Sequence, residues 1–235
     1  MDPILARDLS GKTIPACVYS RCMSHNSPAI SHSSKFSSWL FLTALALAFP
    51  VANARSQTLA KIRVGDSSAN LNSLGSDPIA QDSYKSFTVR KWLLSAGDEF
   101  SATAEPSGRL RYIELDWGGK STSLACDLSG ITFGVTTLTD IRKRFGSNGF
   151  GFQDRGGVAD IPDGVVMLNS YEIGNMVVTF YTKVLRDLSL SAADSTLPVA
   201  DRAKLDAISI ADTDYATSEW GQRIYDPAYK KAEWK

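Results

Sequence analysis

The chain has 235 residues, with 25 basic and 25 acidic side chains, so its formal net charge is zero. This balance excludes the strongly basic surface of a dedicated nucleic-acid-binding protein. A hydrophobic content of 43% and an aromatic content of 10% exclude an intrinsically disordered chain and are typical of globular proteins.

The first clear pattern lies near the N-terminus and is typical of a secretory signal peptide. Residues 39–49 read WLFLTALALAF, and this apolar run follows a lysine and precedes a small-residue A-x-A sequence. The run is shorter than the ~20 residues that cross a membrane. We therefore predict export with cleavage after Ala54, from a start at Met1 or, given the long lead-in, at Met23. We expect no transmembrane anchor and, because no cysteine follows the cut, no lipid anchor.

Export determines which residues remain for chemistry. Both histidines and two of the three cysteines precede residue 55, so residues 55–235 contain no histidine and only Cys126. Histidine-dependent triads and the usual catalytic zinc sites cannot be built from that composition, and one thiol cannot form an internal disulfide. We expect no metal and no cofactor. We interpret Cys126 as a small buried side chain, with an intermolecular thiol as the alternative.

Two stretches about 70 residues apart share one pattern, which predicts tandem units. Residues 62–67 (IRVGDS) and 131–136 (ITFGVT) both read apolar, spacer, apolar, glycine, any residue, then a further residue that is Ser or Thr. This hydroxyl residue is expected to cap a short helix, and a later glycine is expected to end the helix in a left-handed conformation. The motif positions are Gly65, Ser67 and Gly75 in the first unit and Gly134, Thr136 and Gly146 in the second.

Strand patterns follow each predicted helix, as β-forming residues and alternating polarity indicate. The predicted strands span residues 87–94, 100–104, 109–117, 165–173 and 176–184. The last two are joined by Gly174-Asn175, a two-residue hairpin signal. We therefore predict an α+β fold with two tandem units, residues 55–125 and 126–186. In each unit short helices would pack on an antiparallel β-meander.

Two regions outside the repeat supply the candidate binding residues. Residues 148–164 (NGFGFQDRGGVADIPDG) are rich in glycine and lack a regular period, so we expect a long functional loop. Residues 187–235 form a C-terminal tail, with a helix predicted from Pro198 to about Ile210 because Leu205 and Ile208 are three residues apart. Surface aromatic residues in such segments are typical of binding hot spots. The predicted binding residues are Phe150, Phe152, Asp154, Arg155, Trp220 and Tyr225.

The order of glycine, helix cap, short helix, glycine and β-meander resembles a known envelope fold. It is similar to the fold of β-lactamase inhibitory protein and of the small lipoprotein of the outer-membrane β-barrel assembly machinery, over residues 62–117 and 131–184. The resemblance implies helices packed on a small antiparallel sheet, in tandem, and a protein-binding surface. This chain has no lipidation cysteine and cannot form the inhibitor's disulfides, so β-lactamase is not carried over as a target.

The sequence thus predicts an exported, non-catalytic protein-binding module of the bacterial cell envelope, most simply of the periplasm. Its partner is expected to be an envelope protein rather than nucleic acid. One alternative is a small apolar or glycan ligand held between the two sheets. Another is a carboxylate-dependent hydrolase that uses Glu114 and Asp116, which lie two apart on one strand and share a face. A solvated sheet face explains this pair as well.

Two smaller patterns have structural explanations beside the functional ones. Asp160 and Asp163, or the acidic residues within 212–214, could bind Ca²⁺ or could simply form turns. Residues 142–144 (RKR) could bind phosphate, or could complement the negative end of the second predicted helix.

Overall fold

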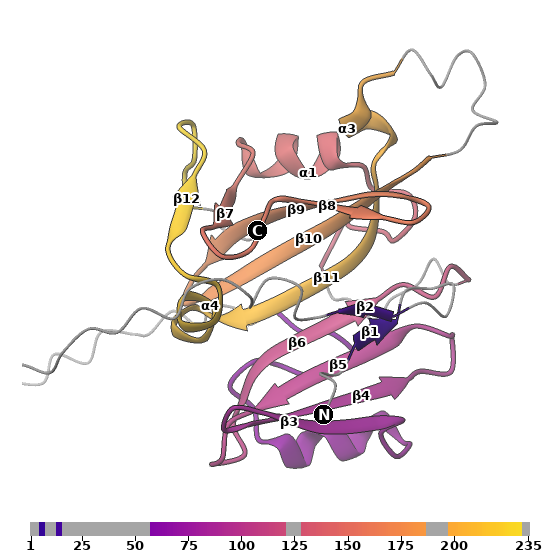
Figure 1. Cartoon of the computed structure of the whole chain (residues 1–235), viewed down its shortest axis with the longest axis vertical. Coiled ribbons are helices and arrows are strands. Elements are labelled where there is room, and N and C mark those ends of the chain that lie inside the picture. The colour runs from indigo at the N-terminus through magenta and orange to yellow at the C-terminus, as the bar shows by residue number, and fades with distance from the viewer. Residues whose placement is uncertain (1–4, 8–12, 16–56, 121–127, 187–196, 232–235) are drawn as a thin grey trace, which may run out of the picture.

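The computed structural model describes residues 5–7, 13–15, 57–120, 128–186 and 197–231. Ten strands form one antiparallel sheet in the order β12-β7-β9-β10-β11-β6-β5-β4-β3, with β8 also paired to β9 (Figure 1). These strands are β3 (Ala80–Tyr84), β4 (Phe87–Leu93), β5 (Glu99–Ala104), β6 (Leu110–Asp116), β7 (Phe150–Phe152), β8 (Val158–Ile161), β9 (Gly164–Ile173), β10 (Met176–Leu185), β11 (Lys204–Asp212) and β12 (Arg223–Tyr225). Separately, β1 (Leu5–Arg7) pairs with β2 (Thr13–Pro15).

The helices are short. They are η1 (Ser68–Leu74), α1 (Leu138–Phe145), α3 (Val199–Arg202) and α4 (Thr213–Trp220). No helix in the described part of the chain has the length and apolar character needed to cross a membrane.

This architecture corrects the predicted fold class of two tandem helix-plus-meander units. One large sheet runs through both predicted units and through the C-terminal tail, and strands far outweigh helices. The strand that joins the two halves is β11, which comes from the tail and lies between β10 and β6 (Figure 1). The strands β3 to β12 therefore form one sheet rather than two.

The predicted helix from Pro198 to Ile210 is wrong. Only α3 is helical in that stretch, and most of it belongs to the central strand β11. Leu205 and Ile208 both face the main core, and this three-residue spacing imitates a helical period. A β-bulge is the cause, because the register of β11 against β10 skips Asp206 and returns Leu205 to the same face as Ile208.

The other strand predictions are confirmed to within a residue or two at each end. Gly174 and Asn175 form the turn between β9 and β10, as the hairpin signal required. The expected loop at 148–164 is partly wrong, because it contains β7 and β8, which both pair with β9. Strands of three or four residues are too short to show a period in the sequence.

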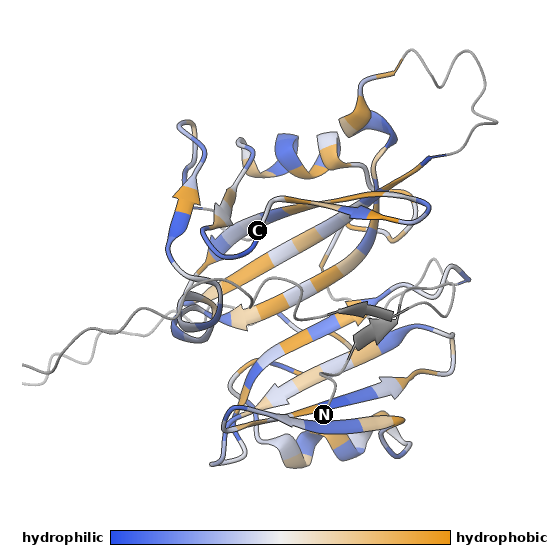
Figure 2. Ribbon diagram, in the orientation of Figure 1, coloured by the Kyte–Doolittle hydropathy of each residue, from blue (hydrophilic) through white to orange (hydrophobic). Residues whose placement is uncertain are grey.

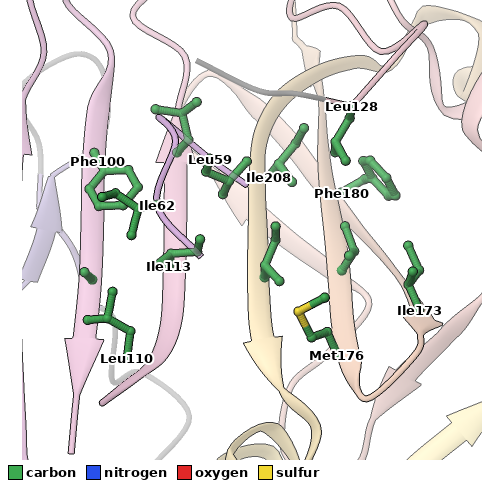
Figure 3. Packing of buried hydrophobic residues seen from close by; sticks show 14 of the residues in the cluster. Leu59, Ile62, Phe100, Leu110, Ile113, Leu128, Ile173, Met176, Phe180 and Ile208 are labelled. Carbon is green, nitrogen blue, oxygen red and sulfur yellow. The ribbon is translucent and has the colours of Figure 1, made fainter. Parts of the chain in front are cut away.

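The first face of the sheet carries the main apolar core. Figure 3 shows Ile113 of β6, Ile208 of β11 and Phe180 of β10 in one layer that crosses the junction of the two halves. Both η1 and α1 contribute to this core, through Leu71 and Ile141. Because the core is continuous, the two halves share one set of packing interactions and should fold together.

The second face carries a smaller core and a band of polar residues. Its buried apolar members are Phe150, Phe152, Val177, Ala211, Tyr215 and Ala216. Two of these belong to α4, so that helix covers part of this face. Thr179 and Ser209 are buried between apolar neighbours that face the main core. Figure 2 shows this alternation of hydrophobic and hydrophilic residues along the strands.

A tight turn before η1 completes the main core. Leu59 and Ile62 are fully buried and exchange both backbone hydrogen bonds, at 3.0 and 2.9 Å. Ala60 and Lys61 between them have φ of 51° and 65°, a turn geometry that glycine or asparagine usually occupies. The burial of the two flanking side chains beside Ile113 (Figure 3) holds this strained turn in place.

The motif residues of the first predicted unit have the roles that the sequence predicts. Ser67 caps η1 by accepting a hydrogen bond from the N–H of Ala69 at 3.2 Å, and Gly75 ends the helix with φ of 77°. Gly65 also has a positive φ, 94°, and its N–H donates to the carbonyl of Leu110 at 2.8 Å. This bond ties the segment before η1 to β6.

In the second predicted unit one cap assignment is wrong. Thr137 rather than Thr136 caps α1, because Asp140 three residues later completes a capping box with it. Thr136 is buried, and its hydroxyl accepts a backbone N–H from four residues earlier. Gly146 ends α1 as predicted, with φ of 69°. Gly134 has the same φ and lies so close to an indole ring that a Cβ there would overlap it.

Candidate functional site

The predicted loop and the C-terminal tail meet at one end of the sheet, where β7 pairs with β12. All six predicted binding residues lie in this assembly. We call these six residues the loop–tail cluster: Phe150, Phe152, Asp154, Arg155, Trp220 and Tyr225. Phe150 packs on Tyr225 with ring centroids 5.1 Å apart, and Phe152 packs on Trp220 at 5.2 Å. Two segments distant in the sequence therefore form one surface.

The cluster has a buried base and an exposed rim. Phe150 and Phe152 are only 3% and 4% exposed and belong to the core of the second face, so they are not surface aromatics. Tyr225 is 44% exposed, and its neighbour Ile224 is 63% exposed. Asp154 is also exposed, and its N–H donates to the carbonyl of Trp220 at 3.0 Å. The base residues support the fold, and the rim residues are accessible to a partner.

Arg155 connects the cluster to the central strands. Its guanidinium lies 4.2 Å from the Trp220 ring centroid and 5.2 Å from that of Tyr181, and it donates a hydrogen bond to the Tyr181 hydroxyl. Burial lowers the pKa of Arg155, but the nearby tyrosines and Glu114 outweigh burial and raise it above its usual value. The side chain therefore stays charged and holds this part of the chain over the sheet.

Next to Arg155, two tyrosines converge on one carboxylate. Tyr112 and Tyr181 both donate to Oε2 of Glu114, Tyr181 at 3.0 Å, and the Tyr181 hydroxyl lies 3.2 Å from Oγ of Ser209. Burial, together with the charge of Glu114, raises the pKa of Tyr112 well above its usual value. Burial also raises the pKa of Tyr181 to about 12. Both phenols keep their protons at neutral pH and remain donors.

Sequence reasoning selected Glu114 and missed both of its tyrosine partners. Tyr112 lies two residues before Glu114 on the same strand, so alternation alone places it on the same face. Tyr181 could not be found in this way, because it reaches Glu114 only through the pairing of β10 with β11 and of β11 with β6.

Glu114 and Asp116 face the same side of β6, as predicted, opposite Ser209 and Ala207 of β11. Burial raises the pKa of Asp116 well above its usual value, and the charge of Glu114 raises it further, although Lys91 opposes this. The two carboxyl groups thus have unlike surroundings, as acid and base groups often do. Among the described residues, no group of three or more His, Cys, Asp or Glu side chains could hold a metal ion.

Replacing Asp116 by asparagine is expected to stabilise the protein at neutral pH. Because folding raises the pKa of Asp116, the folded state binds this proton more tightly than the unfolded state. Below about pH 4 Asp116 is protonated in both the folded and the unfolded state, so it does not lower the free energy of unfolding there. As the pH rises from there towards the folded pKa, the free energy of unfolding falls, and asparagine abolishes this fall.

Urea midpoints measured from about pH 4 to pH 8 should therefore diverge in favour of Asp116→Asn. Asp82→Asn is the control, since Asp82 is an exposed carboxylate on β3 and its replacement should leave the midpoints parallel to the wild type. A midpoint for Asp116→Asn that is equal to or below that of the wild type at neutral pH would contradict the prediction.

The smaller candidate sites are occupied by structural contacts. Asp160 and Asp163 form ion pairs with basic residues at the end of β10, at 2.5 and 3.0 Å. Asp212 caps α4 and pairs with Arg111 at 2.8 Å. Residues 142–144 lie in the last turn of α1, where the structural explanation requires basic side chains. Arg144 also donates to the carbonyl of Ser129 at 2.6 Å. Cys126 lies outside the described residues.

Comparison with known proteins identifies no family. No family model and no curated protein matches the sequence. One solved structure that aligns with the chain is an extracellular protein containing an SCP domain from Bacillus anthracis str. Ames, with a TM-score of 0.37 and 10% sequence identity. The match covers 86% of this chain and 56% of that protein, so the chain spans little more than half of its length. A likeness at this TM-score carries no functional argument.

Proposed function

We propose that the protein is an exported, non-catalytic module that binds another protein of the bacterial cell envelope through the loop–tail cluster. The observation that carries this proposal is the convergence of the two segments, since β7 from the loop pairs with β12 from the tail. Residues selected only for their binding chemistry thereby come to lie in one place. The signal-peptide pattern before residue 55 supports export to the periplasm.

The anatomy of the cluster supports the proposal. Binding hot spots combine Trp, Tyr and Arg side chains with a rim that excludes water. Here Arg155 stacks on Trp220 at the centre, and Tyr225 and Asp154 lie exposed at the rim. Tyr225 lies on β12 and Asp154 lies in the turn directly after β7, and both segments are anchored on the second-face core. Little conformational entropy should therefore be lost when a partner binds.

The test uses the purified protein as bait in an envelope extract, with bound proteins quantified by mass spectrometry. The rim variant combines Asp154→Lys with Tyr225→Ala. The control, Leu93→Ala, changes a side chain on β4 that is 52% exposed and lies outside the cluster. We expect the wild type and the control to enrich one protein that the rim variant recovers at least ~10-fold less. Equal recovery by all three, with unchanged thermal unfolding, would count against the proposal.

A second candidate function, a carboxylate-dependent hydrolase, is favoured by one observation. Glu114 and Asp116 share a face, and burial raises the pKa of Asp116 well above its usual value. Cell-wall glycan incubated with the purified protein is the substrate to assay. Cleavage that is lost in both Glu114→Gln and Asp116→Asn would support a hydrolase, whereas cleavage that both variants retain would exclude this pair.

A further inference from the structure

The sheet order ends at β3 on one side and at β12 on the other, and these two edges differ in charge. β3 is exposed and carries Asp82 at its centre, and a charge in that position opposes pairing with a second copy of the same edge. β12 instead carries Ile224 at its centre, 63% exposed. Its one charged residue, Arg223, forms an ion pair with Glu172. β12 therefore lacks the charge that protects the other edge.

The backbone of β12 offers hydrogen-bonding groups on its outer side. Just before β12, the N–H of Gln153 donates to the carbonyl of Gln222 at 2.8 Å. Hydrogen-bonded and non-hydrogen-bonded pairs alternate along an antiparallel ladder, so the next residue to bond towards β7 is Ile224. The N–H and C=O groups of Arg223 and Tyr225 consequently point away from β7.

The side of β12 that carries Ile224 is open. The residue opposite Ile224 on β7 is Gly151. A Cβ placed on Gly151 would meet no atom within 4 Å. No side chain of β7 therefore covers Ile224, which leaves it free to pack against an apolar side chain that arrives at the outer edge.

We propose that two copies of this chain pair edge to edge through β12, antiparallel, about a two-fold axis at Ile224. In this register Arg223 of each copy is opposite Tyr225 of the other, so the outward N–H and C=O groups of both strands form hydrogen bonds. Ile224 of one copy is opposite Ile224 of the other, so the two exposed side chains pack against each other on one face of the joined sheets. The contact is isologous, because the same residues meet from both sides.

The charges of the chain permit this pairing, and its size makes it weak. After cleavage at Ala54 the chain carries 21 basic and 23 acidic residues, a formal net charge of only −2, so two copies repel each other little at long range. A contact centred on three residues buries less surface than a standard interface, and it should therefore form a dimer only at high protein concentration. This self-association goes beyond the proposed function and does not depend on an envelope partner.

Sedimentation equilibrium of the purified protein, over roughly 5–500 µM, tests the pairing. Tyr225→Pro removes an outward N–H and keeps the bonds to β7, whereas Tyr225→Ala removes the same ring and keeps that N–H. We expect the mean mass of the wild type and of Tyr225→Ala to rise towards twice the monomer value. Tyr225→Pro and Ile224→Glu should stay at the monomer mass. A monomeric wild type, or equal association of the proline and alanine variants, would overturn the proposal.

Cysteine cross-linking tests the register of the pairing. It also shows whether the two β12 strands meet even if the Tyr225→Pro variant fails to fold. The background has serine at the three native cysteine positions, 17, 22 and 126. Ile224→Cys places the two thiols on directly opposed residues, whereas Tyr225→Cys places them two residues out of register, beyond the ~7 Å Cα separation that a disulfide can span. Faster formation of covalent dimer by Ile224→Cys is expected. Equal rates of dimer formation by the two cysteine variants would refute the register. Such a result would leave the proposal of an envelope partner standing, because that proposal is tested separately by capture from the extract.

Discussion

Replacing Gly149 by alanine is expected to lower the free energy of unfolding by about 3 kcal/mol and to detach the loop–tail cluster from the sheet. Gly149 has φ of 76°, a conformation that costs a residue with a Cβ about 1–2 kcal/mol. Its Cβ would also overlap the carbonyl oxygen of Ser170, a backbone atom of β9 that cannot move without disturbing the sheet. The carbonyl of Gly149 accepts the N–H of Asp226, so its displacement also releases the tail.

Gly151→Ala is the matched control, only two residues further along the chain. A Cβ at Gly151 meets nothing within 4 Å, so its stability should stay within about 0.5 kcal/mol of the wild type. Urea denaturation of both variants, followed by tryptophan fluorescence, measures the difference. Similar stability losses at the two positions would mean that the crowding at Gly149 is not what makes glycine necessary there.

Replacing Phe180 by alanine is expected to lower the free energy of unfolding by about 3–5 kcal/mol. Phe180 is fully buried in β10, with ring centroids 5.5 Å from Phe145 of α1 and 6.0 Å from Tyr171 of β9. Truncation leaves a cavity where the helix and two strands meet, and the surrounding structure can close it only in part. Leu93→Ala is the control and should cost less than about 1 kcal/mol because the side chain is 52% exposed.

Hydrogen exchange of the Phe180→Ala variant also tests whether the two halves of the sheet form one cooperative unit. Because the main core is continuous across the junction of β6 and β11, amides of β4 and β5 should lose protection together with those of β9 and β10. Loss of protection confined to β9 and β10 would instead show that the halves unfold independently.

Local features of the fold could be predicted because their signals lie within a few residues. Ser67 and Gly75 mark the two ends of η1, and Gly174-Asn175 marks the β9–β10 hairpin, since caps and tight turns depend on the conformations of the residues themselves. The assignment of Thr136 as a cap failed for a reason of the same kind. Two threonines are adjacent there, and Asp140 has the capping-box spacing only from Thr137.

The fold class could not be predicted, because it depends on which strands pair across long separations. Nothing in the sequence near residues 204–212 indicates that this segment enters the sheet between β10 and β6. The bulge at Asp206 also places Leu205 and Ile208 on the same face of the sheet although they are three residues apart, a spacing that the sequence alone shares with a helix. Without β11 the two meanders would be separate units, and with it they are halves of one sheet.

The amino-acid sequence by itself determined the chemistry that residues 55–235 can carry: no histidine, one cysteine, and aromatic and charged side chains concentrated in a glycine-rich stretch and a tail. The tertiary structure alone decided how these residues are used. Pairing of β7 with β12 brought Phe150, Phe152, Arg155, Trp220 and Tyr225 together. Tyr225 shares a face with Phe150, but it lies on the edge strand and stays exposed, whereas the two phenylalanines are buried one strand further in. Composition and local propensity are properties of single segments, whereas burial and contact are properties of the pairings between segments, which only the folded chain establishes.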